Sequence, residues 1–206
     1  MGTDVPLAQV MGKRSDFKRR GRDFYPTPVK AVEPLIPHLS SSFTYVEPCA
    51  GGGDLIDALD TFEGVAHDGK FSPKCYGASD IEPGISKYGV RFAQKDAFDI
   101  EDVPRDIDLF ITNPPWDRNI LHPLIIHLIG MRPTWLLFDA DWMHTRQSAP
   151  YLRNFCKRIV SVGRIKWIPD SPHTGKDNCA WYLFDERDPD QDDPTVFCGR
   201  DYCIRA

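Results

Sequence analysis

The stretch FTYVEPCAGGGDLIDALD, residues 43–60, contains the pattern that decides the fold. Its first six residues are mostly apolar or β-branched and predict a short buried strand. The glycines Gly51 to Gly53 then form a turn, because glycine accepts positive φ and lets a ligand approach the backbone closely. Residues 54–60 carry apolar side chains at helical spacing, so the turn leads into a helix whose first N–H groups are available to a ligand.

Strands and helices alternate through most of the remaining chain. Apolar runs predict six further strands at residues 75–83, 91–98, 106–116, 134–142, 158–167 and 178–185. Helical spacing predicts helices at residues 118–130 and 148–156. Short connections and this alternation favour an α/β sheet with helices on both faces. In such folds ligands bind at the carboxyl ends of the strands, near a topological switch point.

Composition and charge exclude several classes of protein. The 206 residues suit one domain, and 25 basic against 30 acidic residues give a net charge of −5, which excludes a uniformly basic nucleic-acid coat. No run approaches the roughly 18 apolar residues of a membrane span, and we expect no secretory signal. The six cysteines form no CxxC pair and the six histidines lack ligand spacing. We therefore expect a protein of the reducing cytoplasm that binds no metal.

The chain divides by composition into three parts. Residues 1–23 are expected to be a flexible basic arm, residues 24–185 the folded domain, and residues 186–206 an acidic tail. Between residues 13 and 22 the net charge is +5, and exposed basic arms commonly bind phosphate backbones. A solvated arm with no partner is the alternative. Its basic residues are Lys13, Arg14, Lys18, Arg19, Arg20 and Arg22.

The most specific signal is Asn113-Pro114-Pro115-Trp116, directly after the apolar run DLFIT. The two prolines end the strand and fix φ near about −65°, so they form a rigid edge. The Asn113 side-chain oxygen and the Pro114 carbonyl could accept both hydrogens of an exocyclic amine, which favours a pyramidal nitrogen with its lone pair aimed at an electrophile. Trp116 offers a face on which a base can stack. The alternative is a turn with a capping Asn and a packing Trp.

Polar residues also stand near the ends of other predicted elements. Asp80 ends the second strand, where an acid in Rossmann-like folds accepts hydrogen bonds from ribose hydroxyls. Glu82 is the reserve for that role, and a helix N-cap is the alternative for Asp80. Thr27 could cap a short helix that has Pro28 at its first position.

With these motifs in place, the chain resembles a known family, the class I S-adenosylmethionine-dependent methyltransferases that modify amino groups, specifically adenine-N6 enzymes acting on DNA. Residues 24–28 (FYPTP), 47–55 (EPCAGGGDL) and 113–116 (NPPW) carry the resemblance, in the order of the gamma-type members. It covers roughly residues 24–185. It implies a Rossmann-like class I methyltransferase fold with a mostly parallel seven-stranded sheet, and S-adenosyl-L-methionine as cofactor. It also points to a bacterial or phage restriction–modification setting.

The resemblance implies a role for each matching residue. The methionine end of the cofactor would lie against Tyr25, Thr27 and Pro28. Its amino-acid and ribose portion would be lined by Glu47, Pro48, Gly51 and Gly53. Its ribose hydroxyls would bind Asp80, and its adenine would contact Ile81, Asp96 and Ala97. The target amine would be held by Asn113, Pro114, Pro115 and Trp116.

DNA, double- or single-stranded, is the implied partner. Reaching N6 in a duplex requires that the adenine be flipped out of the stack. Backbone contacts are expected from the basic arm and from Lys166, His173 and Lys176 in a late loop, for which an ordinary strand connection is the alternative. No separate recognition domain is visible. The DNA bases would be recognised by residues 141–150 and 166–178, by the arm, or by a partner subunit. A homodimer is possible.

Two other functions stay open. The same chemistry suits RNA adenine, RNA guanine-N2 or a protein glutamine amide. A non-catalytic binding subunit with this fold is the second alternative. A cytosine-C5 mechanism would need a Pro-Cys nucleophile, and we reject it because Cys49, although it follows Pro48, lies inside the glycine-rich loop.

Overall fold

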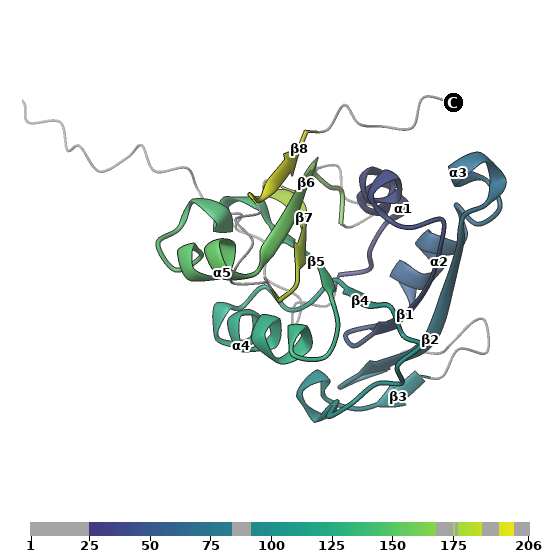
Figure 1. Ribbon diagram of the computed structural model, residues 1–206, viewed down its shortest axis with the longest axis horizontal. Helices are drawn as coiled ribbons and strands as arrows, with labels where there is room; N and C mark the ends of the chain where they lie inside the picture. Colours follow the sequence, from purple (N-terminus) through teal and green to yellow (C-terminus); the bar gives the residue numbers. More distant parts are fainter. Residues whose placement is uncertain (1–24, 84–91, 168–174, 176, 187–193, 200–206) are drawn as a thin grey trace, which may run out of the picture.

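An eight-stranded sheet forms the centre of the molecule (Figure 1). The computed structural model describes residues 25–83, 92–167, 175, 177–186 and 194–199. The strands lie in the order β3-β2-β1-β4-β5-β7-β6-β8. Their bounds are β1 (Ser42–Glu47), β2 (Ser72–Asp80), β3 (Phe92–Gln94), β4 (Leu109–Thr112), β5 (Thr134–Asp139), β6 (Cys156–Arg164), β7 (Asn178–Phe184) and β8 (Val196–Cys198).

Short helices connect these strands. The α-helices are α1 (Val29–Val32), α2 (Asp54–Asp60), α3 (Ala66–Gly69), α4 (Arg118–Ile129) and α5 (Ala149–Asn154). The 3-10 helices are η2 (Glu33–His38), η3 (Ala97–Asp99) and η4 (Ala140–His144). In the part of the chain that is described, no helix has both the length and the apolar character that a membrane span requires.

The sheet is mostly parallel, as the family resemblance implied. β1 pairs in parallel with β2 and with β4, and the pairs β2–β3, β4–β5 and β6–β8 are also parallel. β7 runs antiparallel between β5 and β6. From β1 the chain builds the sheet outward through β2 and β3, and then returns to place β4 on the other side of β1. The switch point therefore lies between β1 and β4, where ligands bind in folds of this type.

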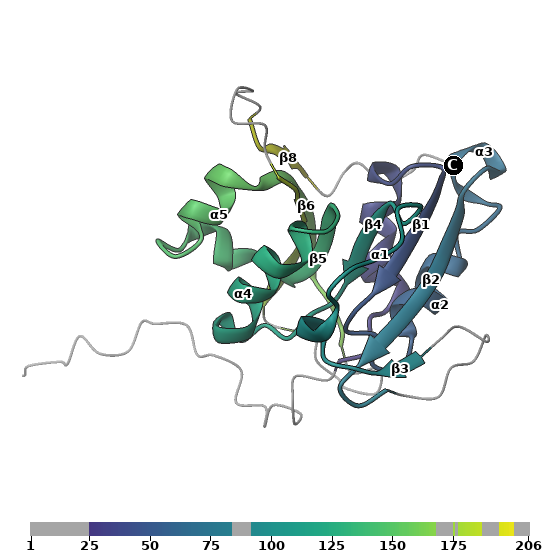
Figure 2. The same ribbon diagram turned by 60° about the horizontal axis from the view of Figure 1, so that its bottom comes forward.

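Both faces of the sheet are covered by apolar side chains. One cluster joins β1 to α1, η2 and α2, and the other joins α4 and η4 to the opposite face. Figure 2 shows α4 and α5 on one side of the strands and α1 and α2 on the other. Burial on both faces explains why these strands are nearly continuous apolar runs rather than alternating ones.

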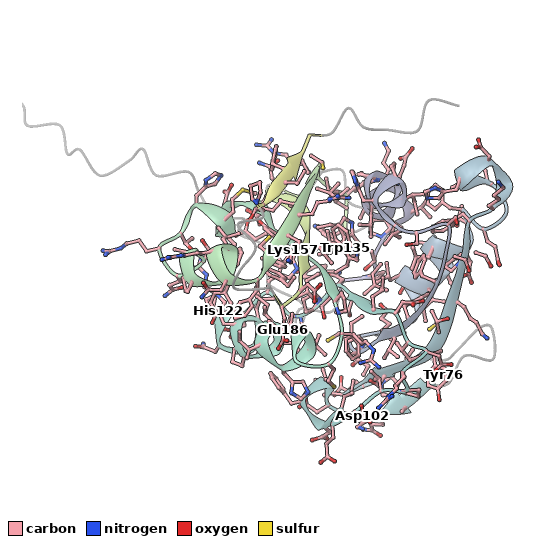
Figure 3. The ribbon with its side chains drawn as sticks, in the orientation of Figure 1. Tyr76, Asp102, His122, Trp135, Lys157 and Glu186 are labelled. Carbon is pink, nitrogen blue, oxygen red and sulfur yellow. The ribbon has the colours of Figure 1, made fainter. Side chains whose placement is uncertain are left out.

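Neighbouring residues of the central strands enter opposite clusters. Trp135 of β5 belongs to the cluster of α1 and α2, whereas the next residue, Leu136, belongs to that of α4. Figure 3 labels Trp135 in the interior and Tyr76 at the outer edge of β2, where Tyr76 is 46% exposed. This alternation follows from the two-residue period of a β-strand.

The expectation of seven strands is wrong by one. The segment Val196–Cys198, expected to lie in the acidic tail, forms β8 and pairs with β6 from Arg158 onward. The Thr195 hydroxyl donates to the Cys156 carbonyl at 2.7 Å and holds the start of this strand. Three residues after an acidic run are too few to show a strand period in the sequence.

Most element boundaries differ from prediction by a few residues, and two of these differences are at α1 and β2. Helix α1 begins at Val29 with Pro28 as its N-cap and without a side-chain cap bond, so Thr27 does not cap it. Strand β2 begins at Ser72, three residues before the predicted start, because Ser72 and Pro73 continue the pairing with β1. Thr27 is consequently free of the capping role, and its hydroxyl has a different partner.

Candidate functional site

A cavity of about 440 Å³ lies at the carboxyl ends of β1, β2, β3 and β4. Every one of these strands contributes the residues that follow it, and the segment before α1 closes one side. The cavity therefore lies where the α/β pattern predicted a ligand site. Its walls comprise Tyr25, Pro26, Thr27, Glu47, Pro48, Cys49, Ala50, Gly51, Gly52, Asp54, Leu55, Asp80, Ile81, Glu82, Asp96, Ala97, Phe98, Pro115, Ile120 and Leu124.

The glycine-rich loop after β1 forms one wall. Gly51 and Gly53 have φ of +52° and +86°, which is the left-handed region that favours glycine. Gly53 N donates to the Ala50 carbonyl at 2.7 Å, and Ala50 N donates to the Ser79 carbonyl at 2.9 Å. The loop is thus tied both to itself and to the end of β2, and Gly53 is the N-cap of α2.

Asp80 connects this loop to the next wall. Its Oδ2 accepts from Gly51 N at 2.9 Å, and its Oδ1 accepts from Glu82 N at 2.8 Å. Asp80 therefore caps the turn after β2, which is not the helix N-cap considered as its alternative role. Each carboxylate oxygen can accept more than one hydrogen bond, so Asp80 can hold the loop and still accept from a ligand. Glu82 lines the same cavity.

Glu47 is the most deeply buried charged residue of the site. It is 1% exposed, and its Oε2 atom has no hydrogen-bond partner among the described residues. Burial raises the pKa of the Glu47 carboxyl well above its usual value, and the carboxylates of Asp54, Asp80 and Asp57 raise it further. A buried polar atom without a partner costs free energy, so this position favours a ligand that supplies a hydrogen-bond donor.

The cavity is acidic. Five carboxyl side chains line it, and no Lys, Arg or His is among its described lining residues. They are Glu47, Asp54, Asp80, Glu82 and Asp96. Such a set attracts a cation and repels phosphate groups. The arrangement therefore differs from the phosphate-binding loops of nucleotide-binding proteins, although both use a glycine-rich turn.

Cys49 also lines the cavity, and burial raises the pKa of its thiol to about 12, with a further contribution from Asp80. A thiol with so high a pKa is protonated at neutral pH. Since the thiolate is the reactive form of cysteine, Cys49 is unsuited to act as a nucleophile. This supports the rejection of a cytosine-C5 mechanism.

The segment Asn113 to Trp116 lies beside the cavity. Pro115 is part of its wall, whereas Asn113 contacts two residues that line it. The Asn113 amide nitrogen donates to the Tyr25 carbonyl at 3.4 Å and to Thr27 Oγ1 at 3.2 Å. The Asn113 side-chain oxygen accepts from Trp116 Nε1 at 3.3 Å. The amide is thus held between two parts of the chain.

An aromatic cluster adjoins this segment. The ring of Trp116 meets that of Trp167 edge to face, with centroids 5.8 Å apart, and Tyr25 lies 6.3 Å from Trp167. The sequence prediction did not assign Trp167. Trp167 is partly buried, and its place at the end of a predicted strand is the signal that could have been noticed.

Most of the predicted cofactor residues line the cavity, but five of the residues predicted to contact the cofactor or the target amine do not. Those on the wall are Tyr25, Thr27, Glu47, Pro48, Gly51, Asp80, Ile81, Asp96, Ala97 and Pro115. Those absent from it are Pro28, Gly53, Asn113, Pro114 and Trp116. Two of these residues, Pro28 and Gly53, are instead the N-caps of α1 and α2.

Sequence reasoning missed several apolar residues of the wall. Ile120 and Leu124 of α4 and Phe98 of η3 all line the cavity. Phe98 and Ile120 are each 39% exposed, and the predicted Ile81 is 45% exposed. Helical spacing made Ile120 and Leu124 look like core residues, because periodicity does not show which apolar residues remain uncovered. These side chains suit a flat apolar ligand group.

The predicted nucleic-acid contacts lie mostly outside the described residues. Lys166 is described and exposed, two residues after the end of β6. The arm from Lys13 to Arg22, His173 and Lys176 fall in segments that the structure does not describe. Among the described residues, no group of three or more His, Cys, Asp or Glu side chains is arranged to hold a metal ion.

A scan against protein-family models and a search of curated proteins find no match. Solved structures do match. One, from Listeria monocytogenes, is assigned to the class I S-adenosylmethionine-dependent methyltransferases, with a TM-score of 0.51 and 11% identity over 83% of this chain and 62% of its own. A second belongs to a type I restriction–modification system, with a TM-score of 0.53 and 13% identity over 84% of this chain and 44% of its own.

A third is protein 1320 of Thermoplasma acidophilum, with a TM-score of 0.53 and 15% identity over 76% of this chain and 83% of its own. The chain spans less than two thirds of the length of the first two. At sequence identities this low, the structural similarity shows a shared fold and nothing about activity. The chain therefore has the fold of the class I S-adenosylmethionine-dependent methyltransferases.

Proposed function

We propose that this protein is an S-adenosylmethionine-dependent methyltransferase that methylates the N6 amine of adenine in DNA. The observation that carries the proposal is the acidic cavity beside Asn113-Pro114-Pro115-Trp116, at the switch point of a methyltransferase fold. The cavity suits the cofactor, and the neighbouring segment suits an amine.

The charge of the cavity supports this cofactor over other nucleotides. S-adenosylmethionine has a positive sulfonium and a positive ammonium group, and it has no phosphate. The described lining residues include five carboxyl groups and no Lys, Arg or His. Those carboxyl groups that are ionised attract such a ligand and repel ATP or a dinucleotide. The unpartnered Glu47 oxygen also fits, because the ammonium group or a ribose hydroxyl could donate to it.

The residues are assigned to the cofactor as the resemblance implies. Glu47 and the glycine-rich loop would hold its amino-acid and ribose portion, and Asp80, with Glu82 nearby, the ribose hydroxyls. The exposed apolar side chains of Ile81, Phe98 and Ile120 would cover its adenine ring. Asp96 and Ala97 would read the edge of that ring, and Tyr25 would lie near the methionine end.

The cofactor supplies a methyl group activated by the sulfonium. In the proposed transfer the amine nitrogen donates its lone pair to the methyl carbon, and the sulfur keeps the electrons of the broken bond. Asn113 and the Pro114 carbonyl accept the two amine hydrogens and orient the lone pair. The methylated amine then loses one proton to water. Trp116 packs against the base.

DNA is the proposed substrate because the basic arm favours a phosphate backbone. Flipping of the adenine would bring its amine to Asn113. Lys166, exposed near Trp167, is proposed as a backbone contact close to the site. His173, Lys176 and the arm keep the same proposed role.

The test measures transfer of labelled methyl from S-adenosylmethionine to matched DNA, RNA and protein substrates. We expect label in the N6 position of adenine in DNA. Asn113→Ala should abolish transfer, whereas Asn154→Ala, an exposed asparagine at the end of α5, should leave it unchanged. Full activity in Asn113→Ala would overturn the assigned role.

Two results of these experiments would favour a different function. Label in RNA or in a glutamine amide, with none in DNA, would keep the chemistry and change the substrate. Absence of heat on titration with S-adenosylmethionine in a calorimeter would show a binding subunit that has the fold without the activity.

A further inference from the structure

Three hydrogen bonds hold the side chain of Asn113, and two of them come from a distant part of the sequence. Tyr25 and Thr27 lie 88 and 86 residues before Asn113 and accept from its amide nitrogen. Trp116, three residues after it, donates its indole N–H to the amide oxygen. No sequence motif indicates the contact between Thr27 and Asn113.

The chemistry of these partners determines which way the amide points. A backbone carbonyl can only accept a hydrogen bond, and an indole N–H can only donate one. If the Asn113 amide turned over, its oxygen would face the Tyr25 carbonyl and its nitrogen would face the Trp116 indole. Both contacts would then be repulsive. The Thr27 hydroxyl, at 3.2 Å, adds the shorter of the two bonds to the amide nitrogen.

Packing keeps the two side-chain partners in place. Thr27 is 6% exposed. Trp116 packs against both hydrophobic clusters and meets Trp167 edge to face. The backbone at Gly175 approaches so closely that a Cβ there would lie 2.6 Å from the Ile165 carbonyl and 3.3 Å from the Trp167 ring. The close backbone at Gly175 restricts Trp167, and burial of Thr27 and packing of Trp116 against Trp167 restrict the two side-chain partners.

We propose that Thr27 and Trp116 are positioning residues. They hold the Asn113 amide with its nitrogen on the Thr27 side and its oxygen on the Trp116 side, and the target amine meets that oxygen. This rests on the proposed function, in which that oxygen accepts an amine hydrogen. A carbonyl oxygen has two lone pairs, so it can keep the indole bond and accept from the amine as well. Thr27 then serves the transfer step, whereas the resemblance assigned it to the cofactor.

Kinetics of Thr27 variants provide the first test. Thr27→Val replaces the hydroxyl by a methyl group of similar size, and Thr27→Ser keeps the hydroxyl. Loss of one hydrogen bond should lower kcat by roughly three- to tenfold, while calorimetric Kd for S-adenosylmethionine stays within about twofold. Thr27→Ser should recover most of the rate. A raised Kd with unchanged kcat would return Thr27 to the cofactor and overturn the proposal.

A double variant tests whether the two residues act through the same amide. Trp116→Phe keeps an aromatic ring and removes the donor. If both residues orient Asn113, the combined Thr27→Val/Trp116→Phe variant should lose clearly less activity than the product of the two single losses. Losses that simply multiply would show independent roles and count against the proposal.

An NMR measurement works even without activity. Each of the five tryptophans gives one indole N–H signal in the ¹⁵N-labelled protein, and Trp116→Phe identifies the Trp116 signal by its loss. Thr27→Val should shift that signal and Thr27→Ser should leave it in place. The Trp142 signal is the control, because the Trp142 indole donates to His122 Nε2 at 2.9 Å and not to Asn113. An unmoved Trp116 signal overturns the inference. A shift in a protein that transfers no methyl would keep the coupling of Thr27 and Trp116 through the Asn113 amide and would refute the proposed function.

Discussion

At the scale of single residues, Glu47 links the cavity to the stability of the chain. Its folded-state pKa lies well above the usual value of 4.5, first because of burial and then because of neighbouring carboxylates. Between these two pKa values the native state binds more protons than the unfolded state. The contribution of Glu47 to the free energy of unfolding should therefore be greatest below about pH 4.5 and should fall as the pH rises.

We expect Glu47→Gln to remove this pH dependence. The free energy of unfolding of the wild type, relative to the variant, should fall by up to about 1.4 kcal/mol per pH unit above pH 4.5 until Glu47 ionises. Urea unfolding at pH 5, 6 and 7 without cofactor measures it. Glu33→Gln, at an exposed position of η2, is the control and should differ from wild type by less than about 0.5 kcal/mol at each pH.

Cys49 gives the second prediction at this scale. Because the pKa of its thiol is about 12, Cys49 stays protonated and should take no covalent part in methyl transfer. Cys49→Ala should keep kcat within about threefold of the wild type in the labelled-methyl assay. Complete loss of activity, in a variant that circular dichroism shows to be folded, would require a mechanism through the thiol.

At the scale of elements, the turn from β1 into α2 depends on backbone conformation. Gly53 has φ of +86° and begins α2 as its N-cap, so any L side chain there is strained. The loop is also bonded to the end of β2 through Ser79 and Asp80. Strain at Gly53 should consequently spread to the cavity wall.

Gly53→Ala should lower the free energy of unfolding by roughly 1–2 kcal/mol, the cost of a left-handed conformation for an L residue. It should also weaken binding of S-adenosylmethionine, measured by calorimetry. The matched control is Gly77→Ala in β2, where an added Cβ meets no atom within 4 Å. Equal losses in the two variants would mean that the turn does not depend on a positive φ.

At the scale of the whole molecule, charge is separated between the arm and the rest. Residues 13–22 have a net charge of +5, while the complete chain has a net charge of −5. An acidic body would repel DNA, so binding should depend on the arm. In the proposed function, the carboxyl groups near the switch point would face S-adenosylmethionine and not DNA.

Removal of residues 1–22 should weaken DNA binding and flatten its salt dependence. If all six basic residues of the arm contact phosphates, the slope of log K against log salt should fall in magnitude by as much as about 5. Fluorescence anisotropy at several salt concentrations measures the slope. A full-length variant with glutamine at those six positions separates charge from length, and an unchanged slope in both would exclude the arm from binding.

The sequence by itself determined the features that depend on neighbouring residues. Glycines at 51 and 53, the prolines after β4 and the apolar runs of β1, β4 and β5 each restrict the local backbone, so they indicated the turn, the rigid edge and the strands. The location of the cavity followed as well, since the carboxyl ends of parallel strands share one edge of a sheet.

Only the tertiary structure decided which distant residues meet. It placed the Thr27 hydroxyl on Asn113 instead of on a helix end, and it brought Trp167 to Trp116. It also added β8, which is too short to be visible in the sequence. The physical reason is that these contacts depend on how whole elements pack. Side chains 86 residues apart exert no influence on each other until the sheet brings them within hydrogen-bonding distance.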